Sequence, residues 1–207
     1  MKKMVTILEV GFGNLPSLER VLKQLNVGTK NVESVKDVLH AEHLIIPGVG
    51  SFETAMNYLN QNNYGQALKI RALDLKLPTL GICLGAQIML DIGYEGTAMK
   101  GLSIFKGTVE SLTNKLMHKK SHTGWDVVKF RQDFLGIRGS ESIDLFFNHD
   151  YIMNLDNEVD IAAECDFGGK FAVALKKYQC YAVQFHPEKS QESGLTILRN
   201  FISLNHV

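Results

Sequence analysis

The sequence predicts an α/β protein with a mostly parallel, doubly wound sheet and a β-rich, partly antiparallel second half. Three observations support this fold class. Short apolar runs alternate with segments of helical spacing up to Ile92, as strands alternate with crossover helices. Glycine-rich loops follow several of these runs, at the strand ends where open α/β sheets bind ligands. After Gly93, short strand-like runs succeed one another with few helical stretches between them.

Length and charge limit the possible organisation and partners. With 207 residues, the chain is expected to form one domain over residues 1–207, whose core buries about 70% of the unfolded surface. The 22 basic and 22 acidic residues cancel, and no long run of one charge occurs. This balance argues against a nucleic acid or an anionic membrane as partner. A small molecule or another protein is the expected partner.

Cysteine usage and hydropathy indicate the compartment. The three cysteines lack paired spacing, which favours free thiols in a reducing cytoplasm. The apolar run after Lys3 stops at Glu9, too early for a signal peptide, and no small-residue cleavage site follows. No apolar segment approaches the roughly 20 residues of a membrane span. A soluble, cytoplasmic protein is therefore expected.

The first strand is expected over Met4–Val10, and a tight loop joins it to a helix over residues 15–25. Asn14 is the expected N-cap, and a proline fits the first helical turn, where a missing N–H costs nothing. Gly11 and Gly13 are similar to the start of a dinucleotide-binding loop, but a proline takes the third glycine position. We therefore interpret this loop as structural.

The next segments continue the alternation. Strands are expected near Lys30–Val35 and His43–Ile46, with a short helix over Lys36–Leu39 between them. The loop Pro47–Phe52 places two glycines around one valine, so its backbone N–H groups can face an anion or oxyanion without interference from side chains. Amphipathic helices are expected near residues 52–60 and 66–73.

A strand, a glycine-flanked cysteine and a helix follow in Leu77–Leu90. In a Gly-x-Cys-x-Gly turn, the glycines remove the side chains that would crowd a sharp reversal, so Cys83 projects from the sheet as in a nucleophile elbow. A helix N-terminus favours the thiolate form of such a cysteine. A cysteine that only packs in the core is the competing interpretation. Because Gly50 and Cys83 both follow parallel strands, their loops are expected to face one crevice.

The second half is predicted to consist mainly of short strands. A hairpin turn at Lys176-Lys177 is expected to lead into a strand over Gln179–Phe185. A C-terminal helix capped by Ser193 then closes the chain. The earlier strands of this half are expected over residues 108–112, 125–130, 145–147, 160–165 and 171–174.

A histidine and a glutamate follow the last strand, in His186-Pro187-Glu188. Residues i and i+2 of an extended chain point the same way, so Glu188 can reach His186 and hold its ring. With Cys83, they would supply a nucleophile, a general base and acid, and an orienting carboxylate. Each residue alone is more simply explained as structural. Their coincidence with an elbow cysteine and a glycine-rich loop indicates a catalytic site.

Three other features carry less weight. His118 and His122 have the i, i+4 spacing of metal ligands on a helix. The adjacent lysines repel cations, and no carboxylate or cysteine close in sequence completes a ligand set, so no metal site is predicted. Cys165 and Cys180 lie in strand-like runs and are expected in the core. Trp125, the single tryptophan, fits half-buried packing and an interface equally well.

These motifs resemble those of the triad-type (class I) glutamine amidotransferases and, within that family, the glutaminase subunits of imidazole glycerol phosphate synthase, an enzyme of histidine biosynthesis. The resemblance covers nearly the whole chain. The cysteine and His-Pro-Glu motifs are specific to the family, and the Pro-Gly-Val-Gly loop and Glu-Lys-Ser ending are similar to this subunit in particular. The segments that carry the resemblance are Gly11–Asn14, Pro47–Phe52, Gly81–Gln87, His122–Trp125, Phe167–Gly169 and Gln184–Ser190.

The resemblance implies a flavodoxin-like glutaminase fold and the hydrolysis of L-glutamine to glutamate and ammonia. In this family, the residue matched by Cys83 attacks the side-chain amide to give a glutamyl thioester. The residue matched by His186 protonates the departing nitrogen and later activates water. No metal or organic cofactor is implied. The resemblance assigns the oxyanion hole to Val49, Gly50 and Leu84, and glutamine binding to Gln87, Glu95, His149, Asp150 and Tyr151.

The resemblance also implies a heterodimer, because ammonia released into water would be protonated and lost. The family passes it through a channel to a separate synthase or cyclase subunit, a phosphate-binding β/α barrel. This chain has no room for that second domain. Asn14, Trp125 and Lys189 are the expected interface residues.

Several positions depart from the residues usual in the family. Glu9-Val10 stands where the family usually has Asp-Tyr, and Ser121 stands where it has a proline. Asp126 replaces the usual asparagine, and Asp150 replaces a small hydroxyl residue. Several of these positions lie where the family meets its partner or binds glutamine, so a second hypothesis is a paralogue that feeds a different synthase, such as one amidinating a bacterial surface sugar. A third hypothesis is a catalytically silent binding or regulatory module, and a fourth is a hydrolase that acts alone on glutamyl peptides.

Overall fold

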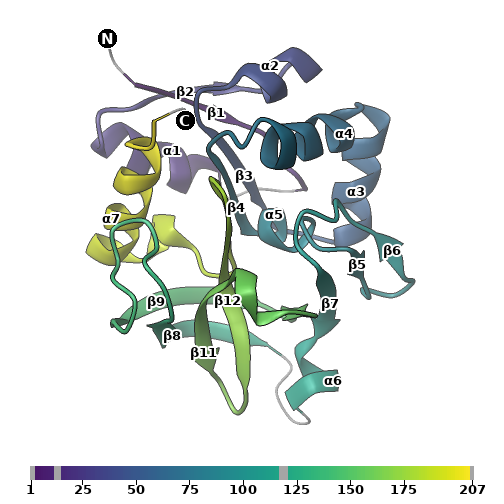
Figure 1. Ribbon diagram of the computed structural model, residues 1–207, viewed down its shortest axis with the longest axis vertical. Helices are drawn as coiled ribbons and strands as arrows, with labels where there is room; N and C mark the ends of the chain where they lie inside the picture. The colour runs from purple at the N-terminus through teal and green to yellow at the C-terminus, as the bar shows by residue number, and fades with distance from the viewer. Residues whose placement is uncertain (1–2, 12–14, 117–120, 206–207) are drawn as a thin grey trace.

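The structure is a computed structural model that describes residues 3–11, 15–116 and 121–205. Within these ranges, one mixed sheet of 13 strands runs through the molecule. Its parallel part comprises β1 (Met4–Ile7), β2 (Gly28–Asn31), β3 (Leu44–Gly48), β4 (Thr79–Cys83) and β13 (Cys180–Val183). From the edge inward, these strands lie in the order β2-β1-β3-β4-β13, and Figure 1 labels the first four of them.

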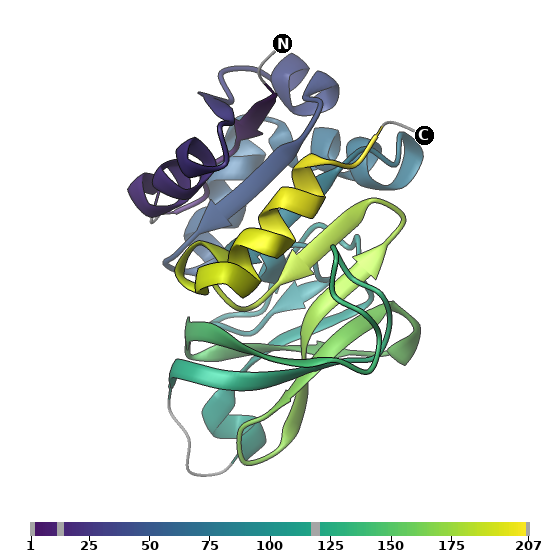
Figure 2. The ribbon, with the colours of Figure 1, turned by 90° about the vertical axis from the view of Figure 1, so that its left-hand side faces the viewer.

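Helices cover the parallel strands on both faces (Figures 1 and 2). One face packs against α1 (Leu15–Gln24) and the C-terminal α7 (Gln191–Ile202). The other face packs against the remaining helices of this half. These are α2 (Val35–His40), α3 (Phe52–Gln61), α4 (Tyr64–Lys69) with a π-helical turn over Ile70–Asp74, and α5 (Leu84–Gln87).

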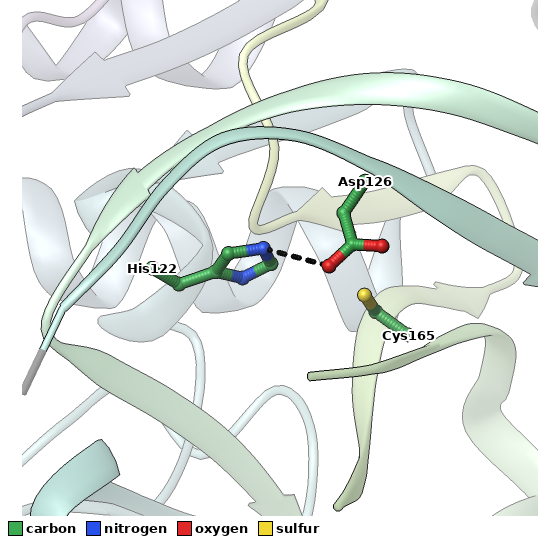
Figure 3. Close-up of side chains that lie close together, drawn as sticks. All are labelled: His122, Asp126 and Cys165. Atoms are coloured by element: carbon green, nitrogen blue, oxygen red, sulfur yellow. Dashed lines mark ion pairs between the residues drawn. The ribbon is translucent and has the colours of Figure 1, made fainter. Parts of the chain in front are cut away.

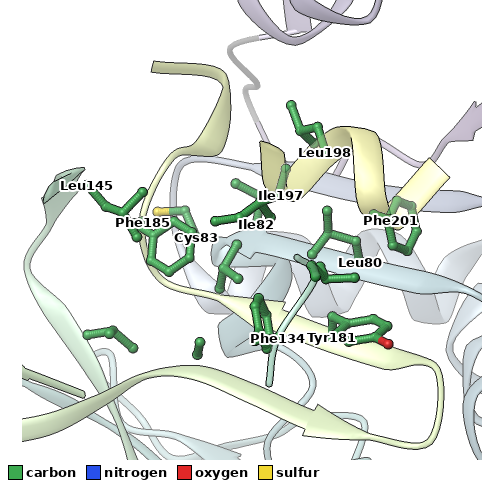
Figure 4. Packing of buried hydrophobic residues seen from close by; sticks show 14 of the residues in the cluster. Leu80, Ile82, Cys83, Phe134, Leu145, Tyr181, Phe185, Ile197, Leu198 and Phe201 are labelled. Atoms are coloured by element: carbon green, nitrogen blue, oxygen red, sulfur yellow. The ribbon is translucent and has the colours of Figure 1, made fainter. Parts of the chain in front are cut away.

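The apolar core is divided by the sheet into two clusters. On β3, Ile45 packs into one cluster, and its neighbours Leu44 and Ile46 pack into the other, because successive side chains of a strand point to opposite faces. Ile82 of β4 and Ile197 of α7 belong to the first cluster (Figure 4). Burial on both faces explains why these strands read as continuous apolar runs.

The second half extends the sheet with mostly antiparallel strands. From β13 the order continues β12-β10-β7-β5-β6, and a branch runs from β12 through β11 and β8 to β9. A short helix, α6 (Leu112–Leu116), follows β7. The strands are β5 (Ile92–Gly93), β6 (Met99–Lys100), β7 (Gly107–Ser111), β8 (His122–Phe130), β9 (Ser142–His149), β10 (Tyr151–Leu155), β11 (Ile161–Asp166) and β12 (Lys170–Lys177).

The fold class expected from the sequence is confirmed, but some local predictions are wrong. Lys176 and Lys177 belong to β12, and the turn falls on the next two residues, where Tyr178 takes the left-handed conformation with φ of 54°. Ser193 lies inside α7, which begins at Gln191. The second strand begins two residues and ends four residues earlier than expected, because an exposed edge strand carries little apolar pattern. Asn14 lies outside the described residues.

Among the described residues, no helix combines the length and the apolar character that crossing a membrane requires.

Candidate active site

Cys83 occupies a sharp turn between β4 and α5. Its φ of 54° and ψ of −111° are strained for a residue with a side chain. A Cβ atom at Gly85 would collide with the carbonyl oxygen of Ile46 on β3, and one at Gly81 would collide with the carbonyl of Gly85. Both glycines are therefore required by close backbone approach. The expected strand, turn and helix are present, although α5 is only four residues long.

The sheet brings His186 to this turn from far along the chain. β13 pairs with β4 in parallel, with Val183 opposite Ile82, so both strands end at the same edge of the sheet. The His186 ring interacts with Cys83 on one side. Its Nδ1 lies 2.8 Å from Glu188 Oε1, and the two side chains are only 3% and 4% exposed. The structure thus brings together all three residues of the predicted triad.

The surroundings of His186 change its protonation. Burial by itself lowers the pKa of His186, but its interactions with Cys83 and Glu188, which include the hydrogen bond to Glu188, outweigh burial and raise the pKa to about 9. His186 is therefore protonated at neutral pH, next to the sulfur of Cys83. A protonated imidazole stabilises a neighbouring thiolate, which is the nucleophilic form of cysteine.

Ser190 fixes the backbone of His186. The Ser190 hydroxyl donates to the His186 carbonyl at 2.7 Å and accepts from the Phe146 N–H at 3.0 Å. The His186 N–H donates to the Phe146 carbonyl at 2.8 Å. The triad loop is thereby tied to β9. Sequence reasoning gave Ser190 no role of its own, since the strand that it contacts lies far away in the sequence.

A cavity of about 470 Å³ opens beside Cys83. Its walls are the loop after β3, the turn at Cys83, the segment after β5 and the turn between β9 and β10. The cavity size suits a small-molecule ligand. Two lining residues, Ser51 and Asn148, were missed by sequence reasoning, although each adjoins a residue that it named. The lining includes all residues that the family resemblance assigns to the oxyanion hole and to glutamine binding, namely Val49, Gly50, Leu84, Gln87, Glu95, His149, Asp150 and Tyr151.

A chain of hydrogen-bonded side-chain amides runs from the Tyr151 backbone in the cavity wall to the sulfur of Cys83. Gln87 Nε2 donates to the Tyr151 carbonyl at 3.1 Å and to Gln184 Oε1 at 3.0 Å. The fully buried Gln184 in turn donates its Nε2 hydrogen to Cys83 Sγ at 3.7 Å. This contact holds the sulfur of Cys83 in place at the cavity wall. Gln184 lies in a recognised motif, but no role was predicted for it.

Glu95 and His149 hold the cavity walls in place. Glu95 Oε2 accepts the N–H of Phe52 at 2.7 Å, which fixes the start of α3 directly after the glycine-rich loop. His149 Nδ1 lies 2.8 Å from the Tyr151 carbonyl. Burial, followed by the neighbouring ring of His122, lowers the pKa of His149 to about 3. His149 is thus neutral, and its Nδ1 carries the proton because a carbonyl only accepts.

Two of the three expected interface residues share one surface. Trp125 of β8 is 47% exposed and meets Phe146 of β9 edge to face, with ring centroids 6.0 Å apart. The Nζ of Lys189 lies 5.6 Å from the Phe146 centroid. We call Trp125, Val127, Phe146 and Lys189 the β8–β9 face. Phe146 was missed by sequence reasoning, and Asn14 lies outside the described residues.

The cysteine predictions hold, but the interpretation of His122 needs correction. Cys83, Cys165 and Cys180 are all free and buried, and Cys180 belongs to the apolar core. His118 lies outside the described residues. His122 begins strand β8 instead of lying on a helix, and a carboxylate and a thiol do lie beside it.

Comparison with known proteins places these features in a family. A family model described as glutamine amidotransferase class-I matches residues 7–204. Imidazole glycerol phosphate synthase subunit HisH 1 of Campylobacter jejuni is 36% identical over 202 residues, which are 97% of this chain and 100% of that protein. The chloroplastic imidazole glycerol phosphate synthase hisHF of Arabidopsis thaliana is 35% identical over 201 residues, which are 96% of this chain but 34% of that protein.

Solved structures agree on the fold. The structure of PurLQS from Thermotoga maritima superimposes with a TM-score of 0.74 at 15% identity, covering 98% of this chain and 99% of the other. Because the family model spans almost the whole chain and relatives above one third identity align end to end, the chain belongs to the class-I glutamine amidotransferase family.

Proposed function

We propose that this protein hydrolyses L-glutamine to glutamate and ammonia and delivers the ammonia to the barrel subunit of imidazole glycerol phosphate synthase. The observation that carries the proposal is the strained Cys83 beside a protonated, buried His186 at the wall of a cavity. Family membership supports the chemistry. Relatives named HisH support histidine biosynthesis as the pathway, rather than the modification of a surface sugar.

In the first half of the reaction, the thiolate of Cys83 attacks the carbon of the glutamine side-chain amide. A C–S bond forms, and the carbonyl electron pair moves onto oxygen. Backbone N–H groups of Leu84 and of the loop at Val49 and Gly50 stabilise this oxyanion. His186 then gives its Nε2 proton to the nitrogen, the C–N bond breaks, and ammonia leaves the glutamyl thioester.

In the second half, His186 is a neutral base. It takes a proton from water, and the hydroxide attacks the thioester carbon. The C–S bond breaks, glutamate is released, and the thiolate of Cys83 and the imidazolium of His186 are restored. Glu188 holds the ring through Nδ1 at 2.8 Å and stabilises its positive charge.

The cavity residues suit the two ends of glutamine. The exposed carboxylate of Asp150 supplies a negative charge for the α-ammonium group. Tyr151 and the backbone around His149 line the same wall. Glu95 and Gln87 are already engaged in hydrogen bonds to the protein, so they shape the cavity and hold its loops.

A synthase partner is supported by two observations. The Arabidopsis relative carries the combined name hisHF, and this chain corresponds to about one third of it. The β8–β9 face presents an exposed tryptophan next to a lysine, and aromatic side chains of this kind are enriched where proteins bind one another. We place the barrel subunit on this face.

Release of ammonia from glutamine, measured with and without the barrel subunit, tests the proposal. The subunit is expected to stimulate release, and Cys83→Ala is expected to lower the stimulated rate by at least about 1,000-fold. Full activity without any partner would favour an independent hydrolase. Stimulation by a sugar-modifying synthase instead of the barrel would assign the protein to a different pathway, and release unaffected by Cys83→Ala would refute the mechanism.

A further inference from the structure

Three potential metal ligands converge between β8 and β11, outside the proposed chemistry. His122 Nε2, a carboxylate oxygen of Asp126 and Cys165 Sγ all lie within 4.8 Å of one another (Figure 3). His122 and Asp126 belong to β8, and Cys165 belongs to β11, where it pairs with Val128. Asp126 is therefore the diagonal neighbour of Cys165 across the strand pair. Strand pairing, not sequence spacing, assembles this cluster.

The hydrogen bonds around His122 define its tautomer. His149 Nδ1 donates to the Tyr151 carbonyl, so in the neutral ring His149 Nε2 is the acceptor for the hydrogen of His122 Nδ1, 3.1 Å away. In a neutral His122 ring, Nε2 then presents a lone pair 3.3 Å from Asp126 Oδ2. A lone pair and a carboxylate repel each other. A proton on either of the two groups, or a metal ion between them, removes this repulsion.

We propose that His122, Asp126 and Cys165 bind Zn²⁺. Two nitrogen or oxygen ligands at about 2.0–2.1 Å from a tetrahedral zinc ion lie roughly 3.3 Å apart, which is the distance from His122 Nε2 to Asp126 Oδ2. A Zn–S bond of about 2.3 Å requires the sulfur to lie roughly 3.6 Å from each of these atoms. The cluster, which spans at most 4.8 Å, needs only a small shift of Cys165.

The ligand types favour zinc over other ions. Mg²⁺ and Ca²⁺ take oxygen ligands, whereas zinc accepts a mixture of sulfur, nitrogen and oxygen. Without an ion, a proton on His122 and a hydrogen bond from the Cys165 thiol to Asp126 would hold the same three groups together, and the metal titration described below distinguishes the two arrangements. The His122 ring is also held firmly, because it stacks between Phe147 and Phe167 with centroid distances of 4.3 Å and 4.0 Å.

A second nucleophilic site does not explain the cluster. Cys165 is buried, with only 2% of the residue exposed, and is absent from the lining of the cavity at Cys83; a metal ion that binds its sulfur would displace the thiol proton. A route for the ion exists, because the side chain of Asp126 is 28% exposed. Bound zinc would link β8 to β11 next to Trp125 and so fix the strand that carries the β8–β9 face.

Metal binding is best tested in the full chain with Cys83→Ala and Cys180→Ala combined. The first change removes the triad thiol as a competing metal ligand, and the second leaves Cys165 as the last of the three cysteines. After chelation, this variant is titrated with Zn²⁺ by calorimetry and with Co²⁺ by absorption spectroscopy. One ion per chain is expected, with a sulfur-to-cobalt charge-transfer band that Zn²⁺ abolishes.

Two further changes in the same background complete the test. Cys165→Ala and Asp126→Asn are each expected to weaken zinc binding by at least about tenfold. Absence of binding in the parent variant would mean that a proton alone occupies the site and would overturn the proposal. Binding without the charge-transfer band would also overturn it. The charge-transfer band is measured in the parent variant alone. The test therefore remains decisive even when Cys165→Ala does not fold.

Discussion

At the scale of single residues, the proposed chemistry depends on one proton, which His186 holds beside Cys83. The ring is buried, and burial disfavours its charge, yet its contacts with Cys83 and Glu188 raise its pKa to about 9. The unfolded chain has no such contacts, and there the pKa of the ring returns to its ordinary value of 6.5. Protonation of His186 is therefore linked to folding.

This linkage gives stability a defined pH dependence. Because the folded pKa of His186 lies above the unfolded value of 6.5, its contribution is fully present below that pH and is lost as pH rises through about 9. Urea unfolding of the wild type should show this decline, and His186→Gln should remove it. Cys83→Ala should reduce the decline and lower the pKa of His186 in an NMR titration. An unchanged pKa in Cys83→Ala would contradict the pairing of the two side chains.

At the scale of elements, the turn at Cys83 depends on backbone contact between β3, β4 and α5. Gly85→Ala should destabilise the protein by about 2–3 kcal/mol, because the new methyl group meets the Ile46 carbonyl oxygen and the backbone must move. Glutaminase activity should fall with it. The matched control is Gly65→Ala on α4, where a methyl group finds only ordinary contact with Leu102. That change should leave stability equal or higher by up to about 1 kcal/mol. If Gly85→Ala and Gly65→Ala changed the free energy of unfolding equally in chemical denaturation, the close approach of Gly85 to the Ile46 carbonyl would be refuted.

A buried arginine joins the elements on the α2–α4 side. Arg71 is fully buried and donates to the Val38 and Pro78 carbonyls at 3.0 Å and 2.8 Å and to Thr79 Oγ1 at 3.0 Å. Arg71→Ala should cost about 3 kcal/mol or more in unfolding free energy, since these acceptors lose a charged donor. The exposed Arg20→Ala on α1 serves as control and should change stability by less than about 0.5 kcal/mol. A small effect of Arg71→Ala would show that water replaces these hydrogen bonds.

The elements differ in how well the sequence predicts them. β3 and β4 are buried on both faces and read clearly as apolar runs, and the glycines around Cys83 indicate the turn directly. The sequence predicts a strand only over residues 145–147 of β9 and none at β10, which follows β9 after one residue and is defined by pairing with different neighbours. β2 is an exposed edge strand, and its position depends on pairing with β1. Pairing between distant segments leaves no local signal.

At the scale of the whole molecule, the sheet collects residues that no sequence spacing connects. The predicted triad residues lie in recognisable motifs at strand ends, whereas Glu95 and the residues of the turn between β9 and β10 were named only from the family resemblance. The roles of Gln184 and Ser190 could not be assigned, since they depend on contacts with the turn at Cys83 and with β9. The cluster at Cys165 was missed for the same reason, because β8 and β11 meet only in the folded sheet.

The β8–β9 face yields a prediction for the assembled enzyme. Trp125→Ala should weaken binding of the barrel subunit by about 2 kcal/mol, roughly 30-fold, because a large aromatic side chain loses its contact. The concentration of the barrel subunit that gives half-maximal stimulation of glutaminase activity should rise by the same factor. Val159→Ala, which removes a side chain from a residue that is 72% exposed, is the control and should bind normally. Equal binding by both variants would place the partner on another surface.

The central claim is that Cys83 is the nucleophile of a glutamine-specific site. The most direct test is to incubate the wild type with an electrophilic glutamine analogue and to locate the adduct by peptide mass spectrometry. The account predicts one adduct, on Cys83, which L-glutamine suppresses and L-glutamate suppresses less, with Cys165 and Cys180 unmodified. Modification of Cys165 or Cys180 in place of Cys83, or labelling that L-glutamine does not reduce, would contradict it.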